Sequence, residues 1–343
     1  MKLNSIKKIM SLTLTAMILL TGCAQSTAQT TEPKQESKEQ EIEEKANQSF
    51  TIGISQLVEH PALDASRQGF IDEMKSLGVN VEFLEQNAQG DIANAQMIAE
   101  KFIKDDVDMI FTIATLSAQA AKQAIEGTNI PMVFTAVTDP VFSQLVSDLN
   151  VTDKNITGVV DAAPIKENLE LFKELKEDIK TIGIIFNIGE SNSEIQVEQT
   201  KEIAKSLGLE IETVGISSVN DIPQAVDTIS KKAEGLYIIT DNMVASSISL
   251  VAKLAQENGL MTVSADGSHV AEGIMVSKGI SYYEIGKQSA VIAKQVLIDN
   301  KNIADIPVQA SDNLEKLVNV KTADALGFKK DHKAFEGAEF IEQ

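Results

Sequence analysis

Small polar side chains follow many of the expected strands of this chain, where a binding site can form. They are hydroxyls, amides and a few carboxylates. In a parallel sheet, ligands bind beyond the carboxyl ends of the strands. We therefore expect a ligand that is held by many hydrogen bonds, with contacts from Ser55, His60, Thr115, Ser117, Gln119, Asp139, Asn187, Asn192, Ser193, Asp241, Asn242 and Asp266.

Two features of these segments suggest a ligand that carries both charges. Expected helix starts at 115–118 and 192–193 present backbone N–H groups and the positive end of a helix dipole, which hold a carboxylate without a basic side chain. Asp241 and Asp139 can accept charge-assisted hydrogen bonds from an ammonium group. Both aspartates also match helix N-caps, and His60 beside Pro61 is either a ligand contact or a local cap.

Enzyme and metal motifs are absent from the sequence. There is no G-x-S-x-G, Walker A, H-E-x-x-H or G-x-G-x-x-G motif. Glu190 and Glu194 could pair as catalytic carboxylates, but a solvated helix start explains them better. With three histidines and one cysteine, the sequence favours neither a nucleophilic triad nor a zinc site. We expect no catalysis, no metal and no cofactor.

The charge of the chain excludes some classes of partner. The formal net charge is −20, from 30 basic and 50 acidic residues. Nucleic acids call for clustered positive charge, and so do anionic membranes. The sequence therefore predicts no nucleic-acid partner and no electrostatic adhesion to a bilayer, and we attribute the acidity to solubility.

An internal repeat indicates two similar lobes. Thr-Ile-Gly-Ile occurs at 51–54 and 181–184, an offset of 181 − 51 = 130, and Lys-Ser-Leu-Gly occurs at 75–78 and 205–208 with the same offset. Asp-Ile at 91–92 and 221–222 also keeps it. The stretch 155–164, Asn-Ile-Thr-Gly-Val-Val-Asp-Ala-Ala-Pro, separates the two copies, so we expect a ligand between two lobes.

Strands and helices alternate in both halves, which is typical of doubly wound parallel sheets. In the first half we expect strands at 49–55, 79–85, 108–112 and 130–134, and helices at 61–77, 92–104 and 116–126. Asp91 should cap the second helix, whose buried stripe includes Ile92, and Thr138-Asp139-Pro140 should open a further short helix.

The second half follows the same plan. We expect strands at 181–186, 210–215, 235–240, 261–264 and 316–319, and helices at 193–207, 221–232, 243–258 and 283–299. Residues 306–309 should be extended, and 322–326 should form a last helical turn.

The N-terminus has the three parts of a secretion signal. Lys2, Lys7 and Lys8 precede an apolar run at 9–20, which is too short for an ordinary membrane span. Leu20-Thr21-Gly22-Cys23 then resembles a bacterial lipobox, in which the cysteine is lipidated. We expect a signal peptide at 1–22, and a lipid anchor with a disordered polar tether at 23–48.

Several segments of the chain form a specific ordered set, which includes H-P-A-L-D (60–64), A-T-L-S-A-Q-A (114–120), V-T-D-P-V (137–141), T-D-N (240–242) and Y-Y-E-I-G (282–286). This set resembles one family, the solute-binding lipoproteins of bacterial ABC transporters with the periplasmic-binding-protein type I fold. The chain is similar in particular to the group that includes tryptophan-binding proteins. The similarity covers essentially residues 50–328.

The resemblance implies an interlobe cleft, a hinge of several crossings and delivery of ligand to a membrane permease. It also implies that the helix from Tyr283 packs back on the first lobe. The N-terminal lobe would then comprise 50–158 plus about 280–305, and the C-terminal lobe 159–279 plus about 306–328. Gly158 and Asp161 would lie at the first crossing, with further crossings near 277–281 and 305–308.

The predicted function is capture of an amino-acid-like solute, with an aromatic amino acid such as tryptophan implied by the resemblance. We expect a monomer, anchored by Cys23 at the extracytoplasmic face of the bacterial membrane and partnered by permease subunits. Three alternatives remain open: a nucleoside or sugar receptor of the same fold, a surface hydrolase using Glu190 or Asp266, and a sensory module.

Overall fold

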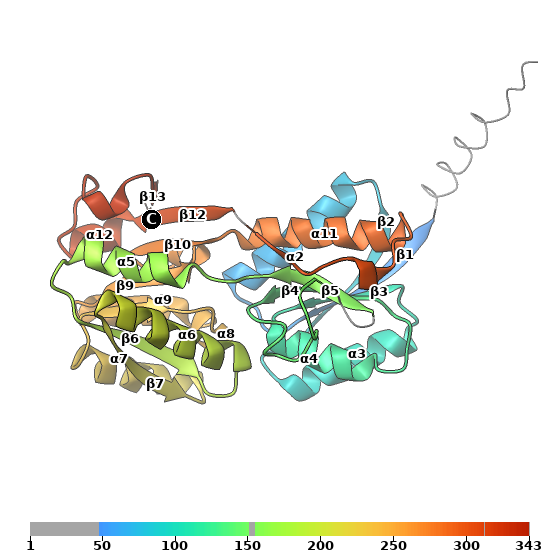
Figure 1. The fold of residues 1–343 in the computed structure, drawn as a ribbon, viewed down its shortest axis with the longest axis horizontal. Helices are drawn as coiled ribbons and strands as arrows, with labels where there is room; N and C mark the ends of the chain where they lie inside the picture. Colours follow the sequence, from blue (N-terminus) through green and yellow to red (C-terminus); the bar gives the residue numbers. More distant parts are fainter. Residues whose placement is uncertain (1–47, 151–154, 312, 343) are drawn as a thin grey trace, which may run out of the picture. The chain divides into compact units, whose positions relative to one another are not determined.

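The computed structural model describes residues 48–150, 155–311 and 313–342 (Figure 1). These residues belong to one compact unit and form two α/β lobes, each built on its own sheet. The predicted signal peptide, Cys23 and nearly all of the predicted tether lie outside the described residues. No helix in the described part of the chain is long and apolar enough to cross a membrane.

The first lobe is a wholly parallel six-stranded sheet covered by helices. Its strand order is β11 (Gln309–Ala310), β5 (Ile156–Val160), β4 (Met132–Val137), β3 (Met109–Ile113), β1 (Ser49–Gln56) and β2 (Asn80–Asn87). Its helices are α2 (Pro61–Ser76), α3 (Ile92–Lys104), α4 (Thr115–Ala124) and α11 (Tyr282–Leu297), with a 3₁₀ turn at Ile303–Asp305. Phe70 of α2 stacks on Phe111 of β3 in the core, with ring centroids 3.8 Å apart.

The second lobe is a seven-stranded sheet with one antiparallel pair. Its order is β13 (Glu339–Ile341), β12 (Leu314–Asn319), β10 (Val276–Ile280), β9 (Met261–Asp266), β8 (Gly235–Ile238), β6 (Thr181–Asn187) and β7 (Glu210–Ile216). Strand β12 runs antiparallel to β10. The α-helices are α5 (Ile165–Leu175), α6 (Ser191–Leu207), α7 (Ile222–Ser230), α8 (Asn242–Ala245), α9 (Ile248–Glu257), α10 (Ser268–Ala271) and α12 (Val320–Ala325), and 3₁₀ turns lie at Val219–Asp221 and Lys333–Phe335.

The repeated glycines have the same physical cause in both lobes. A Cβ atom added to Gly53 of β1 would come under 3.0 Å from Phe102 of α3, and one added to Gly183 of β6 would come as close to Ile229 of α7. In each lobe, therefore, a helix side chain packs onto the bare backbone of a central strand. The predicted pair of similar α/β lobes is confirmed.

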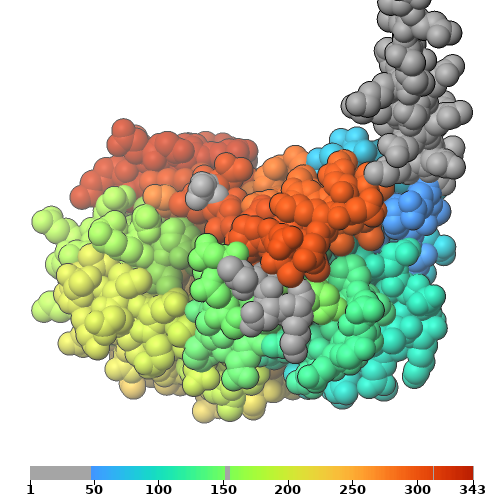
Figure 2. All heavy atoms as spheres, turned by 45° about the vertical axis from the view of Figure 1, so that its right-hand side comes forward, coloured from blue at the N-terminus to red at the C-terminus, as the bar shows by residue number. Residues whose placement is uncertain are grey.

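Helix α11 returns from the second half of the sequence to the first lobe. A Cβ on Gly69 of α2 would collide with the carbonyl oxygen of Tyr283, and a Cβ on Gly286 of α11 with that of Ser66. The two helices approach closely because these glycines leave room. Figure 2 shows α11 in orange beside blue and cyan residues, while the C-terminal residues in red lie over yellow and green ones.

The chain passes between the lobes three times: after β5, between β10 and α11, and between β11 and β12. The third crossing was predicted at 305–308, which is wrong, because Gln309–Ala310 still pair with Val159–Val160 in the first sheet. Gly158 lies inside β5, where a Cβ would collide with the carbonyl oxygen of Phe134. That close approach explains the glycine without any backbone motion, so its hinge role stays a prediction.

Some predicted elements were wrong in detail. The expected helix at 243–258 is two helices, because the backbone of Ser247, with φ −126° and ψ 24°, leaves the helical conformation between α8 and α9. Residues after Asp139 form a turn rather than a helix, and Ile92 is 50% exposed rather than part of a buried stripe. Helix α5, the turn at Lys333–Phe335 and strand β13 were not predicted at all.

Candidate ligand-binding site

A small cavity lies between the two lobes, at the carboxyl ends of both sheets. Its volume is about 20 Å³, which leaves room for little more than one water molecule. From the first lobe and its crossings it is lined by His60, Leu63, Ala136, Thr138, Asp161 and Tyr282, and from the second lobe by Asn192, Thr240, Asp241, Asn242, Ala245, Asp266 and His269.

The structure brings five of the twelve predicted contacts to this cavity: His60, Asn192, Asp241, Asn242 and Asp266. Asp161, which was expected at the first crossing between the lobes, lines the cavity too. The other seven predicted residues do not line the cavity: Ser55, Thr115, Ser117, Gln119, Asp139, Asn187 and Ser193.

The predicted residues of the first lobe mostly bond within that lobe. Ser55 and Ser117 are fully buried, with their Oγ atoms 2.7 Å apart, and Ser117 Oγ also donates to Ser55 O at 2.9 Å. Gln119 donates to the backbone of Ser143 at 3.0 Å. Thr115 is buried at the start of α4, which has no side-chain cap. These side chains therefore serve the lobe's own structure.

Asp139 and Asp241 both accept hydrogen bonds from backbone N–H groups, as their sequence context allowed. Asp139 caps a turn, and Asp241 is the N-cap of α8. Asp139 accepts from the backbone N–H of Val141 at 3.1 Å and of Phe142 at 2.9 Å. Asp241 accepts from Val244 N at 2.9 Å, Asn187 N at 2.6 Å and Ser193 Oγ at 2.7 Å. All three partners of Asp241 belong to the second lobe, so its two oxygens are already engaged.

Burial dominates the electrostatics of Asp241. The carboxyl is 1% exposed, and burial together with the nearby carboxylate of Glu190 raises its pKa to about 7. Three hydrogen bonds to the ionised form oppose this shift without cancelling it. Asp241 therefore titrates near neutrality.

Glu190 organises the second-lobe wall. Its carboxylate accepts five hydrogen bonds, from Asn187 Nδ2, Asn192 Nδ2, Asn242 N, Asn242 Nδ2 and Met243 N. It is 3% exposed, so the interpretation of Glu190 as part of a solvated helix start is wrong. The charge is accommodated because the N-terminus of α8 and three amides surround it.

Two neutral hydrogen bonds connect the walls of the two lobes across the cavity. His60 Nε2 lies 3.3 Å from Asn242 Oδ1, and Thr138 Oγ1 lies 3.2 Å from Thr240 Oγ1. His60 is 7% exposed, and its burial lowers the pKa of the imidazole. A neutral ring thus bridges the lobes.

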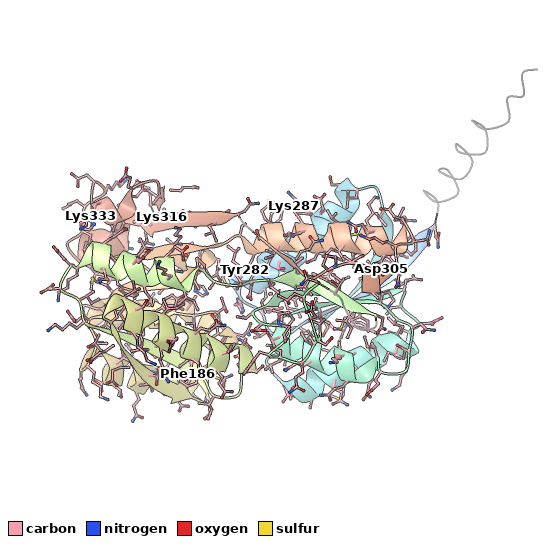
Figure 3. All side chains as sticks on the ribbon, in the orientation of Figure 1. Phe186, Tyr282, Lys287, Asp305, Lys316 and Lys333 are labelled. Atoms are coloured by element: carbon pink, nitrogen blue, oxygen red, sulfur yellow. The ribbon has the colours of Figure 1, made fainter. Side chains whose placement is uncertain are left out.

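Two of the three crossings meet at a third hydrogen bond. Tyr282, which begins α11, lies between the lobes (Figure 3) and donates its hydroxyl to Asp161 Oδ2 at 2.8 Å. Burial raises the pKa of Asp161, and hydrogen bonding to Tyr282 and Thr138 lowers it. Asp161 Oδ1 is buried, and no atom of the described residues, Thr138 Oγ1 included, meets the geometry of a hydrogen bond to it.

Asp266 pairs with His269, a residue the sequence analysis missed. Asp266 Oδ2 lies 3.2 Å from His269 Nε2, although the two atoms are poorly aligned for a hydrogen bond, and His269 Nδ1 lies 2.8 Å from Ser264 Oγ. Both side chains are buried, and burial lowers the pKa of His269. The spacing Asp-x-x-His, which runs from the end of β9 into α10, was a readable signal for this pair.

The other missed lining residues gave weaker signals. Thr138 and Thr240 each stand directly before a predicted contact, Asp139 and Asp241 respectively. Leu63, Ala136 and Ala245 look like ordinary core residues. Tyr282 reaches the cavity only because α11 returns to the first lobe. Ala136 has φ +54°, a left-handed conformation that is strained for alanine.

Two further observations delimit the site. A second hollow, of about 1280 Å³, is open to solvent beside Lys122, Glu126 and Glu194. The buried cavity, which polar side chains of both lobes line, is the better candidate. Within 48–150, 155–311 and 313–342, no group of three His, Cys, Asp or Glu side chains is arranged to hold a metal ion.

A comparison with known families identifies the class of protein. Residues 51–338 match the family of ABC transporter substrate binding proteins. The chain belongs to this family, and it is the solute-binding component of an ABC transporter rather than an enzyme. The family assignment from the sequence is confirmed.

Individual relatives refine the comparison. The chain is 38% identical over 334 residues to a tyrosine-binding protein of Clostridioides difficile strain R20291, covering 94% of this chain and 93% of the relative. More distantly, a glucose-galactose binding protein from Geobacillus stearothermophilus shares the fold, at 15% identity and a TM-score of 0.59 over 79% of this chain and 98% of that one.

Two solved relatives differ in how well they superpose. An ABC domain from Streptococcus pneumonia in complex with L-Trp is 30% identical, covers 84% of this chain and 99% of its own, and gives a TM-score of 0.80. A ligand-free, open substrate binding protein with adhesive properties from Clostridium difficile is 38% identical over 85% of this chain and 99% of its own, with a TM-score of 0.66.

Proposed function

We propose that this protein captures an aromatic amino acid, tyrosine or tryptophan, between its two lobes. The relatives named for tyrosine and L-Trp support this ligand class. The observation that carries the proposal is the buried carboxylate of Asp161, one oxygen of which has no partner while the other is held by Tyr282. A buried carboxylate of this kind calls for a cation.

The ligand's ammonium group is the cation that fits. Asn192 Oδ1 is also buried and unpartnered at the same cavity. An ammonium group between Asp161 Oδ1 and Asn192 Oδ1 would satisfy both acceptors and offset the desolvation of Asp161. Asp161 replaces Asp241 and Asp139 in this role, because their oxygens already accept backbone N–H groups.

The ligand's carboxylate and ring have separate supports. We propose that the carboxylate binds at the start of α4, which lacks a side-chain cap; because α4 does not line the closed cavity, this contact needs the larger cavity of the ligand-bound form. Leu63, Ala136 and Ala245 supply apolar surface for a ring, together with the face of Tyr282.

Capture requires the lobes to move. The cavity of about 20 Å³ is far below the roughly 300 Å³ at which small-molecule pockets begin. The better superposition on the L-Trp complex than on the open protein of higher identity supports a closed arrangement. Ligand entry would break the neutral contacts of His60 with Asn242 and of Thr138 with Thr240, and the lobes would then close around the ligand with a larger cavity than the one described.

The cellular setting is also proposed. Lipidation of Cys23 after cleavage of residues 1–22 would anchor the protein at the extracytoplasmic face of the membrane, and residues 24–48 would act as a tether. The lobe division, with Gln309–Ala310 moved to the first lobe, and a monomeric state belong to the same proposal. Mass spectrometry of the mature protein tests the anchor through the mass of an acylated Cys23 peptide.

A ligand screen tests the function. Tyrosine or tryptophan should raise the melting temperature, with a gain of about 2.7 kcal/mol at a hundredfold excess over the Kd. N-acetyl-tyrosine and N-acetyl-tryptophan should give no shift, because acetylation removes the ammonium charge. A shift with sugars or nucleosides, and none with any amino acid, would contradict the proposal.

A further inference from the structure

Glu190 determines which atoms of two cavity amides donate hydrogen bonds and which accept them. An ionised carboxylate only accepts hydrogen bonds. Asn242 Nδ2 lies 2.6 Å from Glu190 Oε2, so this amide must direct its N–H group to Glu190. Asn242 Oδ1 therefore faces the other way, toward His60 of the first lobe, as an acceptor.

The same reasoning fixes the proton on His60. Asn242 Oδ1 can only accept, and His60 Nε2 lies 3.3 Å from it, so the proton of the neutral ring resides on Nε2. Nδ1 is then a bare acceptor. It is buried at the cavity without a partner, on a side chain that is 7% exposed.

The second amide held by Glu190 has the same polarity. Asn192 Nδ2 donates to Glu190 Oε2 at 3.2 Å and to Thr240 O at 3.0 Å, so Asn192 Oδ1 is left as an acceptor. Asp161 Oδ1, Asn192 Oδ1 and His60 Nδ1 are thus unpartnered acceptors at the cavity, while His269 Nε2 faces Asp266. An ammonium group uses Asp161 and Asn192, and the acceptor on His60 has other neighbours, the carboxylates of Asp266 and Asp64.

We propose that His60 Nδ1 accepts a hydrogen bond from the side chain of the ligand, the phenolic O–H of tyrosine or the indole N–H of tryptophan. Phenylalanine, which has no such donor, is then selected against. This inference rests on the proposed aromatic ligand. The relay Glu190–Asn242–His60 joins both lobes, so the acceptor is fixed only when the lobes are closed.

Isothermal titration of the full folded protein tests the inference with matched ligands. Tyrosine should bind at least about tenfold more tightly than phenylalanine and 4-methyl-phenylalanine, or tryptophan at least about tenfold more tightly than its benzothienyl analogue; tenfold corresponds to about 1.4 kcal/mol. The 4-methyl and benzothienyl groups keep the size of the side chain and remove only the donor. Equal affinities within the pair that binds would overturn the role of His60 and leave the proposed function intact.

Two variants locate the preference. In His60→Leu the preference should fall to within about threefold, because tyrosine or tryptophan weakens while the donor-free analogue does not. In Glu190→Gln the new amide allows Asn242 to flip, so the preference should also fall, whereas Glu194→Gln, an exposed position on the same helix, should keep it. A full preference in His60→Leu would overturn the inference.

A spectroscopic measurement makes the test independent of how the variants fold. Nitrogen-15 NMR of the histidine rings in the wild-type complex should show His60 as the Nε2–H tautomer, with a hydrogen bond at Nδ1. A proton on Nδ1 would overturn the assignment. If tyrosine, tryptophan and phenylalanine all fail to bind the wild type, both the inference and the proposed function fall.

Discussion

The carboxyl ends of the strands carry different chemistry in the two lobes. In the first lobe, a hydroxyl near the end of a strand bonds to a hydroxyl of the same lobe, as Ser55 of β1 does with Ser117 of α4. In the second lobe, the strands end in a carboxylate network around Glu190 that leaves amide oxygens at the cavity. The scaffolds are nevertheless alike, down to the glycine under a helix side chain at positions 53 and 183.

This difference shows which parts of a duplicated fold are tied to packing and which to ligand recognition. The glycines and apolar stripes are set by contacts within a lobe, so both copies keep them. The first lobe contributes mainly His60 and the crossing residues Asp161 and Tyr282 to the cavity. The second lobe largely determines which atoms of the cavity are free to accept hydrogen bonds from the ligand.

Asp161→Asn is the change with the largest expected effect. Loss of the carboxylate should weaken amino-acid binding by about a hundredfold or more, because a buried ammonium would lose its counter-charge. The ligand-free protein should be at least as stable as wild type at pH 8, since burial raises the pKa of Asp161 and the charged form is disfavoured. Calorimetry and chemical denaturation measure the two effects, and parallel losses of both would contradict the assignment.

Asp241 should make the stability of the second lobe depend on pH. Its folded pKa of about 7 exceeds the ordinary 3.8, so its contribution to stability is full below pH 3.8 and is lost as pH rises toward and through 7. Three units correspond to about 4 kcal/mol at most. The stability advantage of wild type over Asp241→Asn should therefore shrink by about 2–4 kcal/mol between pH 4 and pH 8 in urea melts. An advantage that grows with pH would refute the shift.

The shared scaffold predicts similar losses in both lobes. Gly53→Ala and Gly183→Ala should each destabilise by about 1–3 kcal/mol, since each new methyl group overlaps a packed side chain. Gly78→Ala, at a positive φ with open space around it, is a control for backbone strain alone. A large loss of stability in only one of the two variants would show that the two lobes are not packed alike at these glycines.

The smallest expected effect on ligand binding is that of a change in the first-lobe hydroxyls, which contact each other and not the cavity. Ser117→Ala should cost about 1 kcal/mol of stability through the lost contacts with Ser55. Ligand affinity should stay within about twofold, because Ser117 does not line the cavity. A tenfold loss of affinity at unchanged stability would return Ser117 to the binding site.

The parts of the fold that the sequence predicted are those that local patterns encode. The offset of 130 predicted both lobes, because the glycines and helical stripes that carry it are local features. Strand β12 was predicted at 316–319, but its antiparallel pairing with β10 and the added strand β13 were missed, because these pairings join distant segments. Helix α5 was missed although Ile165, Leu169 and Phe172 form a buried helical stripe.

The candidate site was only partly predictable for a related reason. Polar clusters after strands identified Asn192, Asp241 and Asn242. Which oxygens are free depends on Glu190, whose burial is invisible in a pattern that also fits a solvated helix start. Asp161 and Tyr282 come together only because two crossings meet, which no local spacing encodes.

The most direct test of the central claim removes the ammonium group and the Asp161 carboxylate in turn. The affinity of tyrosine or tryptophan is compared with that of its des-amino analogue, in wild type and in Asp161→Asn, by calorimetry. We predict a loss of about a hundredfold or more in wild type and less than about fivefold in the variant, because the two groups bind each other. Equal losses in both proteins would show that the ammonium group lies elsewhere.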